Sequence, residues 1–364
     1  MADPSTGSED SSSHDRHTTA ASFESVTVAP WPNGVATGVG SLPGTDPAEA
    51  MRLVVGELPD FPHLAELPAA GIGTDMIGRG AAHLSELHFE LASSGWRFTQ
   101  RPGADERRAR AALRRDLDVL EECTQGFVGP LKIQCAGPWT LASSIELRYG
   151  DKALADAGAV RDIADALAEG LSELIGEVGR RVPGAKIVVQ LDEPLLPAVL
   201  DGTVPTASGF STLPLVESAT ARERLSAVVR AISGRSAYPV VHCCADRVPI
   251  ELLVESGACA VGLDVTKLSA DSDDAMGTAI ERGLRFFFGV VPSSDVDPLP
   301  TVRETAAPLR ELWGRLGFPA ETLAAHVVTP TCGLAGASPE WPKRAYRRCV
   351  DVARLLLEDP EEDA

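Results

Sequence analysis

A histidine and two adjacent cysteines, His242, Cys243 and Cys244, follow directly on two valines in the stretch VVHCCA. Side chains alternate between the two faces of a strand, so we expect His242 and Cys244 to point to one side and Cys243 to the other. One strand end then offers an imidazole and a thiolate to a common point. Zinc is the usual partner of such a nitrogen and sulfur pair, and it takes four ligands.

Two further zinc-binding side chains stand where predicted strands end. Cys332 ends the stretch HVVTPTC, and Asp264 ends the apolar part of CAVGLDVT, which follows the VVHCC stretch. The alternative is that these cysteines are small apolar core residues, the ordinary state of a buried free cysteine. We expect that state for Cys123, Cys135, Cys259 and Cys349. Ligands on three different strand ends converge only if the chain closes into a barrel.

Short apolar stretches rich in β-branched residues recur along the chain, and most are followed by an amphipathic segment. The predicted strands are residues 34–41, 63–67, 131–137, 186–194, 238–244, 259–266, 285–291 and 326–334. Their continuous apolar character indicates a parallel sheet with helices on the outside. Apolar residues at helical spacing predict helices over 107–120, 160–178 and 303–316. This alternation predicts an α/β fold, a (β/α)8 TIM barrel, with an open doubly wound sheet as the alternative.

Two long connections interrupt the alternation. Residues 68–130 separate the second and third predicted strands, and we expect helices there that extend the barrel. Residues 195–214, rich in Pro, Gly, Ser and Thr, follow the strand that ends in DEP. Loops of this length are often functional. In a barrel this one is expected to cover the carboxyl ends of the strands, where active sites lie.

Composition limits the compartment and the partners. The net charge of −19 argues against nucleic acid or an anionic membrane as a partner, because both attract basic surfaces. Seven cysteines without regular spacing indicate a reducing compartment, and no apolar run is long enough to span a membrane. We therefore expect a cytoplasmic protein. It is expected to have a disordered tail over residues 1–30, a barrel over 31–357 and an acidic tail over 358–364.

A set of short motifs, in their order along the chain, resembles the catalytic barrel of cobalamin-independent methionine synthase. That family shares a superfamily with uroporphyrinogen decarboxylase. The motifs are GVGSLPG (38–44), GPWT (137–140), VQLDEP (189–194), HCC (242–244), the strand end at Asp264, and CGL (332–334). Each motif alone is weak, but the ordered set is specific. The resemblance extends over most of residues 34–357.

The resemblance implies a zinc ion held by His242, Cys244 and Cys332, with Asp264 where the family has a glutamate. It also implies a homocysteine acceptor, whose thiol the zinc binds and presents as a thiolate. General chemistry agrees, since a zinc-bound thiol is deprotonated at neutral pH and the thiolate is the attacking form. The protein is then expected to be a homocysteine S-methyltransferase that forms methionine.

Amino-acid binding is implied at two further motifs. The backbone of Val39, Gly40 and Ser41 matches the family segment that holds the substrate carboxylate, and Asp192 matches the residue that binds the amino group. Other interpretations stay open at both. The pair Gly40–Ser41 is also typical of a plain turn, and Asp192–Glu193 is also typical of carboxylates that cap nearby amides.

The methyl-donor side departs from the family pattern. FFFGVVPSS carries no histidine where the family has its general acid, and Ser144 stands where a folate-stacking tryptophan is expected. GIGTDMIGRG offers Arg79 or Asp75 in place of the family's His-Gly-Glu motif. We therefore assign no catalytic acid. The implied single-barrel short form is expected to take its methyl group from a methylated corrinoid protein instead of methyltetrahydrofolate.

Two other functions stay open. A zinc-binding barrel without catalysis, acting as a sensor or carrier for metal or a thiol amino acid, also fits the missing acid and stacking residues. A decarboxylase of the porphyrinogen kind is a weaker alternative. It needs basic groups for many substrate carboxylates, and the early strand ends show none.

Overall fold

The structure is a computed structural model that describes residues 29–360. Nearly all of the predicted N-terminal tail and the last four residues of the acidic tail lie outside the described residues. Six parallel strands form one sheet in which each strand pairs with the next along the chain. They are β3 (Gly129–Ala136), β4 (Ala185–Asp192), β5 (Tyr238–His242), β6 (Ala260–Asp264), β7 (Arg285–Val291) and β8 (Val327–Pro330).

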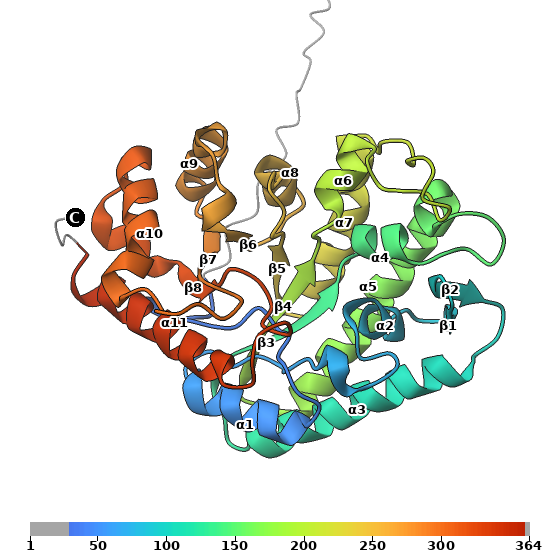
Figure 1. The fold of residues 1–364 in the computed structure, drawn as a ribbon, viewed down its shortest axis with the longest axis horizontal. Coiled ribbons are helices and arrows are strands. Elements are labelled where there is room, and N and C mark those ends of the chain that lie inside the picture. Colours follow the sequence, from blue (N-terminus) through green and yellow to red (C-terminus); the bar gives the residue numbers. More distant parts are fainter. Residues whose placement is uncertain (1–28, 361–364) are drawn as a thin grey trace, which may run out of the picture.

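Isolated backbone bridges close this sheet into a barrel. Ala36 bridges to Val328 of β8, and His63 bridges to Lys132 of β3. Residues 36–41 and 63–66 also join one another, through the bridge from Ser41 to Glu66. They fill the first two strand positions without forming regular strands. Figure 1 shows the strands at the centre with helices around them, and the TIM-barrel prediction is confirmed.

The helices lie outside the sheet, and each predicted helix is present but longer than its apolar pattern indicated. The helices are α1 (Pro47–Glu57), α2 (Met76–Ala82), α3 (Ala104–Cys123), α4 (Pro138–Ser144), α5 (Ala157–Arg181), α6 (Leu196–Asp201), α7 (Ser218–Ser233), α8 (Ile250–Glu255), α9 (Asp273–Glu281), α10 (Val302–Leu316) and α11 (Trp341–Glu358). Side-chain caps mark the starts of two of the predicted helices. Asp156 accepts two amide hydrogen bonds at the start of α5, and Thr301 and Glu304 form a capping box on α10.

Residues 68–130 contain a hairpin in addition to the expected helices. Between α2 and α3, the strands β1 (His88–Ala92) and β2 (Gly95–Thr99) pair as an antiparallel hairpin. Phe89 and Trp96 lie on its buried side with their rings 5.6 Å apart. Alternating apolar residues around the turn were the available signal, but the hairpin is too short for periodicity to outweigh the helical pattern beside it.

Inside the barrel, the layers differ in polarity. An apolar layer that includes Trp31, Phe61 and Phe287 fills the end where the strands begin. Inward positions closer to the carboxyl ends of the strands carry polar side chains instead, as in Gln190 and Asp192 of β4. The barrel is therefore closed at one end and polar at the other. None of the helices within residues 29–360 is both long and apolar enough to cross a membrane.

Candidate active site

Two cysteines from different strand ends meet at the polar end of the barrel. Cys244 lies just after β5 and Cys332 just after β8, and a hydrogen bond of 3.4 Å joins their sulfur atoms. This bond lowers the pKa of Cys332 to about 6, aided by the nearby His242, and raises that of Cys244. The neighbouring Cys243 is fully buried in the apolar core, where burial raises its pKa to about 12.

His242 faces Asp192 from the adjacent strand. Its Nδ1 lies 2.8 Å from Oδ1 of Asp192. The same oxygen accepts a hydrogen bond of 2.7 Å from the side-chain amide Nε2 of Gln190. Both residues are largely buried. The carboxylate therefore holds the imidazole through Nδ1 and leaves Nε2 as the ring nitrogen for another partner, an arrangement common for metal-binding histidines.

Asp264 forms a cap that the sequence did not predict, and its role as a metal ligand stays a prediction. Its Oδ1 accepts hydrogen bonds from the amide and the hydroxyl of Thr266, at 2.9 and 2.7 Å, and so caps the 3-10 helix η3 (Val265–Lys267). Within residues 29–360, no group of three or more His, Cys, Asp and Glu side chains is arranged to hold a metal ion. Two of the predicted ligands are in contact, and the four-ligand zinc site stays a prediction.

The segment Val39–Ser41 lies against the strands that carry these groups. The carbonyl of Val39 accepts hydrogen bonds from Lys132 at 2.8 Å and from Gln190 at 2.9 Å. Ser41 lies close to Gly333, since a Cβ atom on that glycine would stand 2.1 Å from the serine hydroxyl. The predicted carboxylate-binding segment is thus next to the Cys332 strand end, and the role of its residues in binding stays a prediction.

Sequence reasoning missed a buried acidic residue in this layer. Glu66 ends the second strand position, is coupled electrostatically to Asp192, and forms an ion pair of 3.3 Å with Arg79 of α2. Burial is the main cause that raises the pKa of Glu66 and lowers that of Lys132 to about 8. The available signal was the glutamate in HLAEL at a predicted strand end. Arg79 also forms an ion pair with Asp116, and this second contact holds its guanidinium group beside Glu66.

The adjacent acids Asp192 and Glu193 have separate roles. Whereas Asp192 faces His242, Glu193 accepts hydrogen bonds from the amides of Trp139 and Thr140 at 2.9 and 2.8 Å, and from the Thr140 hydroxyl at 2.7 Å. Burial raises the pKa of Glu193 to about 7 although these bonds favour the carboxylate. Amide capping, one of the interpretations left open, therefore applies to Glu193.

Other candidate groups lie in the core. His326 precedes β8 at the apolar end of the barrel, accepts a hydrogen bond from the Phe286 amide, and packs on Phe288 and Trp313. Burial lowers its pKa to about 3. Trp139 is also buried, with its indole donating to the Ala221 carbonyl of α7. Val291, the last residue of β7, is fully buried.

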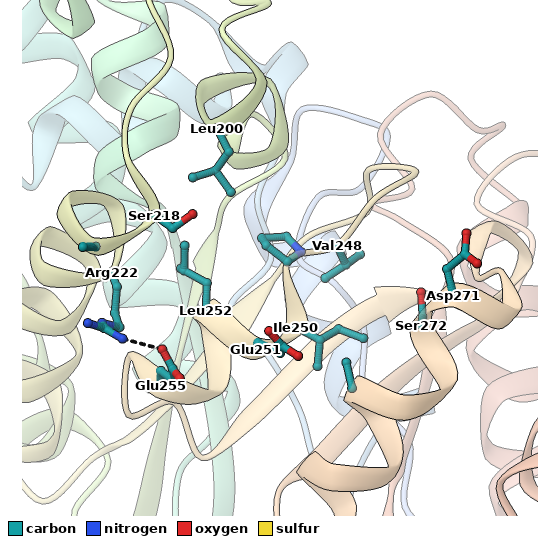
Figure 2. Close-up of a pocket in the computed structure, with 13 residues that line it drawn as sticks. Leu200, Ser218, Arg222, Val248, Ile250, Glu251, Leu252, Glu255, Asp271 and Ser272 are labelled. Atoms are coloured by element: carbon teal, nitrogen blue, oxygen red, sulfur yellow. Dashed lines mark hydrogen bonds and ion pairs between the residues drawn. The ribbon is translucent and has the colours of Figure 1, made fainter.

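A cavity of about 440 Å³ lies beside the loop that follows Cys244 (Figure 2). Val248 and Pro249 of that loop line it together with residues of α7 and α8, including the ion pair between Arg222 and Glu255. Its lining contains none of the groups described above. This cavity is therefore separate from the cysteine pair.

Comparisons with known proteins identify a matching family and similar folds. Residues 129–355 match the family described as "Cobalamin-independent synthase, Catalytic domain". A structure of a B12-independent methionine synthase from Shewanella sp. W3-18-1, in complex with selenomethionine, is similar with a TM-score of 0.57 and 13% identity, covering 89% of this chain and 98% of that one. A β-N-acetylhexosaminidase structure has a TM-score of 0.45 and 11% identity, covering 89% and 71%.

No curated protein matches the chain. The family match nevertheless includes both strand ends that carry Cys244 and Cys332, and it spans more than half of the chain. The protein therefore belongs to the cobalamin-independent methionine synthase family, through its catalytic domain.

Proposed function

We propose that this protein is a zinc-dependent methyltransferase that methylates the thiol of homocysteine to give methionine. The observation that carries the proposal is the Cys244–Cys332 pair at the polar end of the barrel, next to an imidazole held by Asp192. Family membership supports methyl transfer to this acceptor. The zinc ion and the identity of the methyl donor are also proposed.

The donor set fits zinc. Two sulfurs bound to one tetrahedral zinc at about 2.3 Å stand roughly 3.8 Å apart, so a pair at 3.4 Å needs only a small adjustment. His242 keeps Nε2 for the ion because Nδ1 faces Asp192. Cys244, Cys332 and His242 would hold the metal, which would lower the pKa of a bound thiol so that the thiolate is present at neutral pH.

The remaining polar groups suit an amino acid. The carboxylates of Asp192 and Glu66 lie close enough to interact, and two acids in a buried site attract an ammonium group. The segment Val39–Ser41, whose serine lies beside Gly333, would receive the carboxylate of the same molecule. These residues would orient homocysteine with its thiol toward the cysteine pair. Their contribution to catalysis would be to position the substrate, and they would not transfer a proton.

We propose a methylcorrinoid, carried by a corrinoid protein, as the methyl donor. A folate amine must be protonated to leave, and the β7 end offers Val291 where an acid would stand. His326 cannot replace it, because this side chain is buried between β7 and α10, where it packs on Phe288 and Trp313. A cobalt leaving group needs no proton. The missing acid therefore disfavours the folate far more than the corrinoid.

The test is an assay of methionine formation from homocysteine, with zinc present and with methylcobalamin or methyltetrahydrofolate as donor. We expect turnover with methylcobalamin, and folate turnover lower by about 10²–10⁴-fold, the usual contribution of a positioned acid. Efficient folate-dependent turnover would refute the donor assignment. Saturable homocysteine binding without turnover on any donor would identify the alternative, a non-catalytic sensor or carrier.

A further inference from the structure

The loop that carries Cys244 is held by a lysine from the next strand connection. The last bond of this loop with the sheet runs from the Cys243 amide to the Gly262 carbonyl, at 2.9 Å. One residue later, the carbonyl of Cys244 accepts a hydrogen bond of 2.7 Å from Nζ of Lys267. The same ammonium group lies 3.3 Å from the carboxylate of Asp246. The backbone of Cys244 is therefore attached to the β6 side of the barrel.

The position of Lys267 depends in turn on Asp264. Lys267 is the last residue of η3, the short 3-10 helix that follows β6. Asp264 begins this helix and accepts two hydrogen bonds from Thr266, the residue just before the lysine. A capping carboxylate holds a turn together by binding amides that otherwise lack partners. The cap, the turn and the lysine thus form a continuous connection to the cysteine.

Exposure indicates which contact of the lysine matters. The Asp246 side chain is 87% exposed and that of Lys267 is 40% exposed, so their ion pair is screened by water and contributes little. The bond to the Cys244 carbonyl is also exposed, but its acceptor belongs to a half-buried residue and is a backbone atom two bonds from the Cα that carries the thiol. A charged donor makes this bond stronger than one between neutral groups.

We propose that Lys267 and Asp264 are positioning residues that set where Cys244 presents its sulfur. In this role Asp264 acts through the η3 turn and not as a metal ligand. The part of the inference that concerns zinc rests on the proposed function, whereas the part that concerns the loop does not.

Paired substitutions distinguish a cap from a ligand. Asn also caps amides well, so Asp264→Asn keeps the acceptor and removes the charge, whereas Asp264→Ala removes both. Lys267→Arg keeps a charged donor, and Lys267→Met removes it. Lys343→Met is the matched control, because Lys343 is also a half-exposed surface lysine near a carboxylate, that of Glu57, but lies on α11.

The first measurement is hydrogen exchange, in the metal-free proteins, of two amides that hydrogen bonds protect: that of Cys243, which donates to Gly262, and that of Leu268, which donates to Val265 in the η3 turn. We expect about tenfold faster exchange in Lys267→Met and Asp264→Ala, with near wild-type rates in Lys267→Arg, Asp264→Asn and Lys343→Met. Unfolding midpoints by circular dichroism show whether each variant is folded. Unchanged exchange in folded Lys267→Met and Asp264→Ala would overturn the proposal, whether or not the protein binds zinc.

The second measurement is zinc affinity by competition with a chromophoric chelator. Losing an outer-shell partner typically costs about 10–100-fold in metal affinity. We expect a loss in that range in Lys267→Met and Asp264→Ala, and wild-type affinity in Asp264→Asn. An equal loss in Asp264→Asn and Asp264→Ala would show that the carboxylate ligates the ion and would overturn its positioning role. Wild-type protein that binds no zinc would refute the proposed function, and the exchange result would still decide the role of the lysine.

Discussion

The sulfur atoms of Cys244 and Cys332 lie 3.4 Å apart, although 88 positions separate the two residues in the chain. Their strands, β5 and β8, are not neighbours in the sheet, because β6 and β7 lie between them. The contact exists only because the sheet curls and closes through the bridge from Ala36 to Val328. The fold and the proposed metal site therefore depend on each other.

Removing either sulfur is expected to abolish zinc binding. Cys244→Ser and Cys332→Ser should each lose more affinity than the 10–100-fold typical of an outer-shell change, because zinc then loses a ligand. The measurement is metal content and chelator competition on protein purified without a nickel column. Cys243→Ala is the matched control, since this cysteine lies in the core and its truncation should lower the free energy of unfolding by about 1 kcal/mol with zinc retained. Full zinc content in both serine variants would contradict the proposed site.

Asp192 is expected to serve both the imidazole and the substrate ammonium, and two substitutions separate these roles. Asp192→Asn keeps an oxygen that can accept from His242 and Gln190, so zinc affinity should stay near wild type. Loss of the charge should raise KM for homocysteine by about 10–100-fold, the size of a hydrogen bond to a charged group. Asp192→Ala should weaken zinc binding as well. Unchanged KM in the asparagine variant would exclude Asp192 from amino-acid binding.

Glu193 is expected to stabilise the fold without touching the substrate. Glu193→Ala leaves two amides and the hydroxyl of Thr140 without their buried acceptor, which should lower the free energy of unfolding by about 2–4 kcal/mol. Thr140→Val removes only the hydroxyl bond and should cost about 1 kcal/mol. Urea unfolding at pH 7.5 measures both. A Glu193→Ala variant as stable as wild type would contradict this role.

Buried histidines are expected to make the protein less stable in mild acid. Burial lowers the pKa of His326 to about 3, far below its ordinary value of 6.5. Between these values the unfolded chain binds a proton that the folded protein excludes, so stability is complete above pH 6.5 and is lost as the pH falls. From pH 7.5 to 5.5 this group alone should cost about 1.4 kcal/mol.

The variant His326→Gln keeps an acceptor for the Phe286 amide and removes the titrating ring. Urea unfolding at the two pH values should show a loss of stability smaller by about 1.4 kcal/mol than in wild type. His63 and His83, whose pKa values burial also lowers to about 3, should account for part of the remaining dependence. An identical pH dependence in wild type and variant would show that His326 does not contribute.

Local sequence patterns were sufficient for the strands of the barrel and for three of its long helices, but not for the β1–β2 hairpin. Continuous apolar strands and helical spacing are properties of neighbouring residues, so β3 to β8 and helices such as α5 and α10 could be predicted within a few residues. The ordered motifs placed the chain in its family and located both cysteines at strand ends. The first two strand positions were also predicted, but their pairing is limited to single bridges.

Only the tertiary structure decided what each polar side chain contacts. Asp192 and Glu193 are adjacent in sequence, yet one faces His242 inside the barrel and the other caps α4, because successive residues at a strand end point to opposite sides. Glu66 was missed because its partners, Arg79 and Asp192, come from distant segments. A sequence thus determines which residues stand at the strand ends, whereas closure of the barrel determines which of them meet, since that depends on contacts between segments far apart in the chain.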